Sequence, residues 1–297
     1  MKLTSLLRAL RLPFSSASML PYLYGSLLVD GPLRWTPLAL GGAVALLTHL
    51  SANVINDYAD SRSGADGVDP SYYGFFGGSK VIQDGLMKPR HVLAMASALA
   101  AGAFVAVVLL AMHMRSPLIV LLYLGVLALG WAYSCPPASL SYRGLGELTI
   151  GILFGGVTVA GGAFTQSGLL FSPAVVLAAL LHGLLVMGII LCNEIPDAET
   201  DRAAGKRTLV VLLGPERGWL LFSAAASGAA LCLVIMLCLR VVRPAALIAF
   251  IAVWPAWRAA RIMRTAVGNK KELVRASRAA ISTHCLAGLG LLAERCL

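Results

Sequence analysis

The chain has 297 residues, of which 58% are hydrophobic and only 13% are charged. Soluble domains of this length rarely carry so few charges, and long apolar stretches are typical of a helical membrane protein. The net charge of +10 does not indicate a nucleic-acid partner, because no nucleic-acid-binding motif accompanies it and basic loops facing anionic lipid account for it.

Apolar stretches long enough to cross a bilayer recur along the whole chain. The sequence predicts an all-α, polytopic membrane protein, with one domain over residues 1–297 and about nine transmembrane helices. The predicted spans are residues 13–30, 36–56, 91–112, 116–134, 146–165, 172–193, 218–239, 244–262 and 275–293. If the N-terminus is cytoplasmic, most Lys and Arg residues fall in the cytoplasmic loops, as the positive-inside rule requires. The expected location is therefore the inner (cytoplasmic) membrane, with membrane lipid as a partner.

The first polar interruption follows the second predicted span, where Asn53 and Asn56 precede Asp57 and Asp60. The two aspartates are three residues apart, so on a helix they share one face. An uncompensated aspartate at mid-bilayer costs about 2.5–3.5 kcal/mol on insertion scales. These carboxylates therefore need a polar cavity, a cation, or both.

A second acidic segment follows the sixth predicted span and has matching spacing. Asn193 precedes Asp197 and Asp201, which are four residues apart and again share one helix face. Both acidic segments fall on the predicted cytoplasmic side. Oxygen ligands of this kind suit Mg²⁺, whose coordination shell is usually completed by substrate phosphates. Two facing carboxylate pairs therefore predict a clamp for a diphosphate.

Basic residues accompany both acidic segments and the loop between them. Lys80 follows Gly77, Gly78 and Ser79, where glycine backbone can approach an anion closely. The other candidates for neutralising a leaving diphosphate are Arg143, Lys206 and Arg207. Each of these basic residues could instead be an ordinary positive-inside anchor, and Tyr133 and Tyr142 could be aromatic residues of the membrane interface.

Taken together, these segments resemble the UbiA superfamily of intramembrane prenyltransferases. The resemblance rests on Asn53 to Asp66, on Gly77 to Gly85, on Tyr133 to Glu147, and on Asn193 to Arg207. It implies helices around a central cavity with a cytoplasmic polar cap. It also implies Mg²⁺-dependent transfer of a polyprenyl group from polyprenyl diphosphate to an aromatic acceptor.

The resemblance also implies roles for single residues. Asp57, Asp60, Asp197 and Asp201 would hold the metal and act in catalysis, and Asp66 would serve the metal site or the acceptor side. The residues implied in substrate binding are Asn53, Asn56, Lys80, Tyr133, Tyr142, Arg143, Asn193, Lys206 and Arg207.

Two features favour one branch of the superfamily. Gly64 stands where ubiquinone-type enzymes usually have the last aspartate of the first motif, and Asp66 replaces it. This ending, together with the segment from Tyr142 to Glu147, is more similar to enzymes that act on 1,4-dihydroxy-2-naphthoate in menaquinone biosynthesis. A 4-hydroxybenzoate acceptor stays open as an alternative.

Two other classes of membrane protein share some of these features. A transporter for a divalent cation or a phosphorylated solute also uses carboxylates in broken helices, but its ligands are expected in mid-span. The acids here lie at one edge of the predicted bundle. The CDP-alcohol phosphotransferases are a second class, and their Asp-Gly-x-x-Ala-Arg motif is absent from this sequence.

Overall fold

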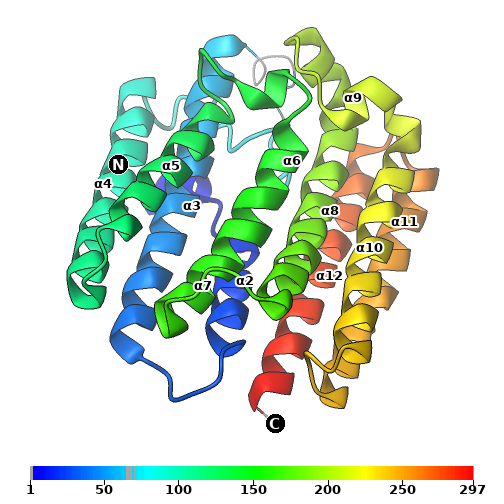
Figure 1. Ribbon diagram of the computed structural model, residues 1–297. Coiled ribbons are helices and arrows are strands. Elements are labelled where there is room, and N and C mark those ends of the chain that lie inside the picture. Colours follow the sequence, from blue (N-terminus) through cyan, green and yellow to red (C-terminus); the bar gives the residue numbers. More distant parts are fainter. Residues whose placement is uncertain (1–2, 65–68, 70, 297) are drawn as a thin grey trace.

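The computed structural model describes residues 3–64, 69 and 71–296, and within them every regular element is a helix. The long helices run between a polar end, which carries the short helix α9 at the top of Figure 1, and an opposite end near the C-terminus. In chain order the α-helices are α1 (Leu3–Leu10), α2 (Ser16–Leu27), α3 (Trp35–Ser63), α4 (Pro89–Met114), α5 (Leu118–Ala132), α6 (Gly146–Ile150), α7 (Thr158–Ser167), α8 (Pro173–Ala203), α9 (Leu209–Leu213), α10 (Gly218–Cys238), α11 (Val253–Thr265) and α12 (Lys270–Cys296). The shorter helical segments are η1 (Leu12–Ser15), η3 (Leu140–Tyr142), η4 (Gly151–Val157), η5 (Pro215–Arg217) and η6 (Pro244–Ala252).

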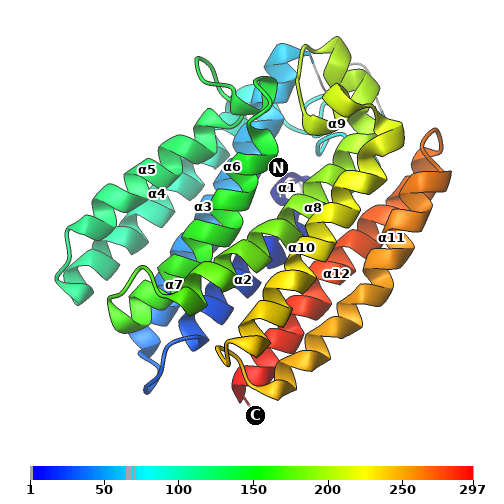
Figure 2. The same cartoon turned by 45° about the vertical axis from the view of Figure 1, so that its right-hand side comes forward.

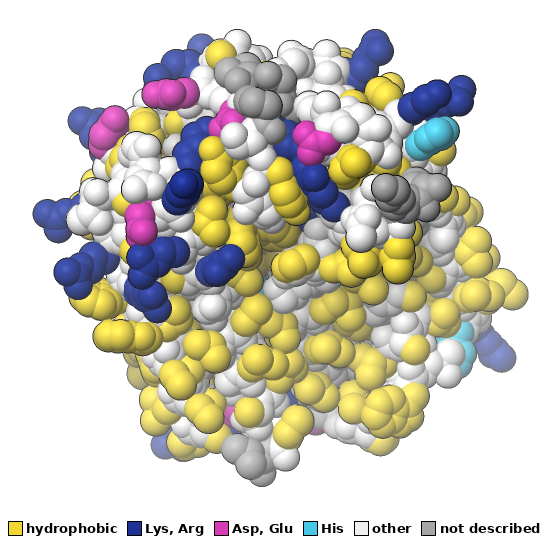
Figure 3. All heavy atoms as spheres, turned by 180° about the vertical axis from the view of Figure 1, so that it is seen from behind, with side chains coloured by type: hydrophobic (Ala, Val, Ile, Leu, Met, Phe, Trp, Pro, Cys, Tyr) yellow, Lys and Arg dark blue, Asp and Glu magenta, His cyan; other side chains and the backbone are white. Residues whose placement is uncertain are grey.

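Six helical stretches are long and apolar enough to cross a membrane. They are Trp35–Ser63, Pro89–Met114, Gly146–Ser167, Pro173–Ala203, Pro215–Cys238 and Pro244–Thr265. Hydrophobic side chains cover most of the face in Figure 3, while charged side chains gather towards its upper end. Such a surface is that of a multi-pass membrane protein.

The other three predicted spans correspond to helices that do not meet this criterion. Residues 13–30 divide between η1 and the 12-residue α2, and residues 116–134 contain the 15-residue α5. Residues 275–293 lie within α12, which has 27 residues but a more polar sequence. The break before α2 coincides with Arg11, which has a left-handed backbone (φ 49°), and with Pro13 in the first turn of η1.

The two helices that carry the acidic segments extend beyond their predicted spans. Helix α3 continues to Ser63 and ends at Gly64, whose φ of 84° suits a glycine C-cap. Helix α8 begins at Pro173, where the Ser172 side chain accepts a hydrogen bond from the Val175 amide, and it continues to Ala203. The acids therefore lie on regular helix at the polar end of the bundle.

Helix α8 is the most buried of the six stretches and organises the core. It packs against α10 and α12 on one side and against η4 and α7 on the other, as the two views in Figures 1 and 2 show. Helix α3 packs against α4 and also contacts α2 and α7. This arrangement places the C-terminal ends of α3 and α8 at the same polar end.

Glycines allow the close contact between η4 and α8. A Cβ atom added at Gly155 would lie 2.4 Å from the backbone of Ala179 and Gly183, whereas one added at the neighbouring Gly156 would meet nothing within 4 Å. Close helix contact through small residues is a common way for membrane helices to associate.

We expect Gly155→Ala to destabilise the protein by about 1–3 kcal/mol, because the added methyl group forces two backbones apart. Gly156→Ala is a matched control one residue away, and it should leave stability unchanged. Thermal unfolding of both variants in detergent checks the prediction. Equal unfolding temperatures for the two variants would contradict the packing described here.

Candidate active site

The α3 carboxylates, Asp57 and Asp60, are buried at the polar end of their helix, with 3% and 7% of the residue exposed. The Asn56 side-chain amide donates to Asp60 Oδ2 over 3.2 Å and to Ser134 Oγ over 2.9 Å. Asp57 Oδ1 accepts a hydrogen bond from the Ser79 amide over 3.2 Å. Asp57 is thus held by a segment beyond α3, and Asp60 is held by Asn56 of the same helix, which is itself tied to Ser134.

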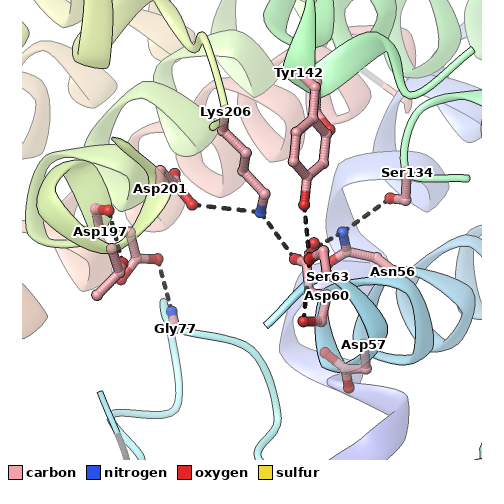
Figure 4. Close-up of polar contacts among 12 residues, drawn as sticks. Asn56, Asp57, Asp60, Ser63, Gly77, Ser134, Tyr142, Asp197, Asp201 and Lys206 are labelled. Carbon is pink, nitrogen blue, oxygen red and sulfur yellow. Dashed lines mark hydrogen bonds and ion pairs between the residues drawn. The ribbon is translucent and has the colours of Figure 1, made fainter. Parts of the chain in front are cut away.

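The α8 carboxylates, Asp197 and Asp201, lie opposite the α3 carboxylates in Figure 4. Asp197 Oδ2 accepts a hydrogen bond from the Gly77 amide over 2.7 Å. The Ser277 hydroxyl donates to Asn193 Oδ1 over 2.8 Å, which ties the same stretch of α8 to α12.

One loop, residues 75–80 and here called the glycine loop, connects the two carboxylate pairs. Its amides at Gly77 and Ser79 donate to Asp197 and Asp57 respectively, so a single short segment touches both helices. Gly77 and Gly78 have φ angles of 72° and 73°, a backbone conformation that residues with a Cβ rarely adopt. Lys80 also has a positive φ, of 57°, and its residue is only 2% exposed. The glycines are therefore needed for the path of the loop.

Lys206 bridges the two helices directly. Its Nζ lies 2.9 Å from Asp60 Oδ2 and 3.3 Å from Asp201 Oδ1, as Figure 4 shows. Burial acts to lower the pKa of the Lys206 ammonium, but the carboxylates of Asp60 and Asp201 outweigh burial and hold its pKa well above its usual value. Lys206 is therefore cationic at any physiological pH.

A pocket opens between the two carboxylate pairs. The residues expected from the sequence that line it are Asn56, Asp60, Lys80, Tyr133, Asn193, Asp197, Asp201 and Lys206. The structure brings these eight residues together from α3, the glycine loop, the end of α5, α8 and the segment before α9.

The remaining expected residues lie beside the pocket or away from it. Asp57 contacts the glycine loop, and the Tyr142 hydroxyl donates to Ser63 Oγ over 2.8 Å. Arg143 is exposed and its guanidinium donates to the Pro137 carbonyl, and Arg207 is also exposed. Asn53 has a buried side-chain nitrogen without a hydrogen-bond partner among the described residues. Asp66 lies outside the described residues.

The N-terminal segment contributes residues that the sequence interpretation treated only as positive-inside anchors. Arg11 lines the pocket and donates to the Phe75 carbonyl over 3.2 Å. Arg8 donates to the Ser79 carbonyl and forms an ion pair with Asp84, each over 2.6 Å. Both arginines thus fix the glycine loop from the outside. Their position after Met1 in a basic N-terminal segment gave no signal of this role.

The sequence also gave no role to Lys270, Glu147 or Glu194. Lys270 forms an ion pair with Asp69 over 2.6 Å, linking α12 to the connection after α3. Glu147 accepts a hydrogen bond from the Leu209 amide, and Glu194 lines the pocket.

The profile of the UbiA prenyltransferase family matches residues 18–281. The chain belongs to this family. It is therefore a prenyltransferase, and this membership excludes the alternative that the protein is a transporter.

Relatives of this UbiA-family chain include curated bacterial enzymes. It is 29% identical to a 1,4-dihydroxy-2-naphthoate octaprenyltransferase of Mycobacterium tuberculosis, over 87% of this chain and 86% of that protein. It is 31% identical to the Escherichia coli enzyme of the same name, over 66% of this chain and 65% of that protein. The aligned part thus spans slightly less than two thirds of the E. coli enzyme.

Solved structures share the fold. The apo structure of a UbiA homologue from Aeropyrum pernix K1 superposes with a TM-score of 0.69 at 21% identity, over 94% of this chain and 97% of the other. A homologue from Archaeoglobus fulgidus, whose structure holds DMAPP and Mg²⁺, superposes with a TM-score of 0.61 at 15% identity, over 97% and 98%.

The carboxylates of this UbiA-family site have the donor chemistry for a hard divalent cation. Asp57 Oδ2 and Asp60 Oδ1 are buried and have no hydrogen-bond partner within the described part of the chain. Buried carboxylate oxygens are costly unless a donor or a cation satisfies them. Among the described residues, no three His, Cys, Asp or Glu side chains converge to hold one metal ion by themselves. Such a site suits an ion whose coordination shell is completed by substrate phosphate and water. Proteins commonly bind Mg²⁺ in this way.

Proposed function

We propose that the protein transfers a polyprenyl group from polyprenyl diphosphate to 1,4-dihydroxy-2-naphthoate, in menaquinone biosynthesis. The observation that carries the proposal is the pocket between the α3 and α8 carboxylates, with Lys206 and Lys80 beside them. The curated relatives named for this naphthoate support the choice of acceptor. The Archaeoglobus fulgidus homologue with DMAPP and Mg²⁺ supports the choice of donor and metal.

The residues of the pocket have separate tasks in this proposal. Asp57, Asp60, Asp197 and Asp201 would hold Mg²⁺, and the ion would offset the negative charge of the departing diphosphate. Lys206 and Lys80 donate to phosphate oxygens, and Asn56 fixes the orientation of Asp60. Arg11 adds positive charge on the N-terminal side of the same pocket.

The apolar interior below the pocket receives the prenyl chain and excludes water from the reacting carbon. The allylic carbon–oxygen bond breaks, and its electron pair leaves with the diphosphate. A carbon–carbon bond then forms at the electron-rich ring. If that bond forms at the ring carbon that bears the carboxylate, the carboxylate leaves as carbon dioxide and the electron pair of its bond to the ring restores the aromatic system, so no oxidant or reductant is required.

The proposal includes an orientation in the membrane. About nine helices cross the bilayer, the N-terminus is cytoplasmic, and the polar end with the active site faces the cytoplasm. The concentration of Lys and Arg in the loops at that end supports this orientation.

A membrane assay with labelled polyprenyl diphosphate tests the function. With Mg²⁺, we expect a prenylated naphthol and carbon dioxide from 1,4-dihydroxy-2-naphthoate, and no product after EDTA treatment. Product from 4-hydroxybenzoate alone would support prenyl transfer as the reaction but would overturn 1,4-dihydroxy-2-naphthoate as the acceptor. Equal activity with and without EDTA would overturn the role of the metal.

A further inference from the structure

Two glutamates near the pocket have no part in the diphosphate site described above. Glu147 is 1% exposed and lies in the first turn of α6, and Glu194 is 6% exposed and lies on α8. Their carboxyl groups are close enough to influence each other electrostatically. Glutamates are almost never buried to this extent unless a partner satisfies them.

The two glutamates differ in how they are held. Glu147 Oε1 accepts a hydrogen bond from the Leu209 amide, which fixes that side chain against the start of α9. Glu194 lines the pocket, and its buried Oε2 has no hydrogen-bond partner among the residues that the structure describes. Leaving a buried acceptor unsatisfied costs free energy, so a donor from a ligand would be stabilised here.

Glu194 also lies at a depth that fits the acceptor. It precedes Asp197 by three residues, which places it about 4.5 Å further from the polar end along the helix. The reacting carbon of a prenyl diphosphate is bonded to the diphosphate and lies on the membrane side of it. Glu194 is therefore close to the level at which the acceptor ring must meet that carbon.

The neighbouring surfaces suit a flat aromatic ring. Tyr133 and Ile190 line the same pocket as Glu194, and Ile190 lies one helical turn below Glu194. An aromatic ring and an aliphatic side chain offer apolar contact, while the glutamate offers a carboxyl oxygen that can accept a hydrogen bond.

We infer that Glu194 is the acceptor-binding residue, and that its carboxyl oxygen Oε2 accepts a hydrogen bond from a phenolic hydroxyl of the aromatic acceptor. This inference rests on the proposed function, because it assigns the acceptor half of the same site.

Binding measurements on the purified full-length protein, without metal or prenyl diphosphate, test the inference. The probes are 1,4-dihydroxy-2-naphthoate and 2-naphthoate, which has the same ring and carboxylate but neither hydroxyl. The wild-type protein should bind the dihydroxy compound at least tenfold more tightly. Glu194→Met, which nearly keeps the side-chain size but removes both acceptor oxygens, should weaken binding of the dihydroxy compound about tenfold and leave binding of 2-naphthoate unchanged.

Glu199→Met is the matched control, because Glu199 lies on the same helix but is exposed. It should bind both naphthoates as the wild type does. Binding of geranyl diphosphate with Mg²⁺ should be the same in the wild type and both variants, which separates acceptor recognition from a general loss of structure.

Two results would overturn the inference and leave the proposed function in place. One is wild-type affinity of Glu194→Met for the dihydroxy compound, and the other is an equal loss of affinity for both naphthoates. A wild-type protein that binds geranyl diphosphate but not 1,4-dihydroxy-2-naphthoate would overturn the proposed acceptor together with the inference.

Discussion

Replacing Asp57 or Asp197 by asparagine should lower prenyl transfer by at least about a hundredfold, a loss comparable to removing one group that stabilises charge in a transition state. Each asparagine keeps a side-chain oxygen that can accept the hydrogen bond from Ser79 or Gly77. The glycine loop should therefore stay in place, while one negative charge is lost from the metal site. Turnover in membranes, normalised to the amount of inserted protein, measures the effect.

The control for these variants is Asp30→Asn. Asp30 is fully exposed and lies just after α2, whose C-terminal end is remote from the polar end of the bundle. Its turnover should remain within twofold of wild type on the same normalisation. Near-normal turnover in both Asp57→Asn and Asp197→Asn would contradict the assignment of these residues as metal ligands.

Lys206→Met should change the affinity of the site for a divalent cation alone and its affinity for prenyl diphosphate with Mg²⁺ in opposite directions. Lys206 now places a positive charge between Asp60 and Asp201, at 2.9 and 3.3 Å. A unit charge within about 4 Å is worth several kcal/mol at protein-like dielectric constants, so removing it should raise the affinity for a divalent cation alone at least about tenfold. The same variant should bind prenyl diphosphate with Mg²⁺ at least about tenfold more weakly, because a cationic donor to phosphate is lost.

Titration of Mn²⁺ by electron paramagnetic resonance, with and without geranyl diphosphate, measures both affinities. Lys206→Arg keeps the charge and serves as the control, and it should not show the gain in affinity for Mn²⁺ alone. The high pKa of Lys206 keeps it cationic throughout neutral pH. A loss of Mn²⁺ affinity in Lys206→Met would show that Lys206 does not compete with the cation.

The local geometry of the acidic segments could be predicted from the sequence. The spacing of Asp57 and Asp60, and that of Asp197 and Asp201, predicted pairs on one helix face, and both pairs lie on regular helix. Hydropathy ended the predicted spans too early, at residues 56 and 193. A hydropathy pattern stops where polar residues begin, whereas α3 and α8 continue because buried contacts at the polar end support their last turns.

The long-range contacts of the site could not be predicted. Lys206 and Asp60 are 146 residues apart, and no periodic pattern specifies which helix ends meet. Arg8 and Arg11 contact the glycine loop because the chain turns at Arg11, and their positions in a basic N-terminal segment indicated only topology.

Arg143 is predicted from the sequence to bind substrate, and in the structure it is not among the residues that line the pocket. The stretch from Tyr133 to Glu147 resembles the family's middle cytoplasmic segment, and in the structure its part from Tyr133 to Arg143 folds back on itself. Ser141 donates to the Tyr133 carbonyl, and Arg143 donates to the Pro137 carbonyl. The guanidinium consequently faces its own loop rather than the pocket.

The most direct test of the account is the position of the metal. A crystal structure with Mn²⁺ and a non-reactive prenyl diphosphate analogue would locate the ion through its anomalous scattering. We predict Mn²⁺ between the diphosphate and the carboxylates of Asp57, Asp60, Asp197 and Asp201, with the Lys206 ammonium moved onto a phosphate oxygen. Mn²⁺ bound elsewhere, with Lys206 still bridging Asp60 and Asp201 beside the analogue, would contradict the account.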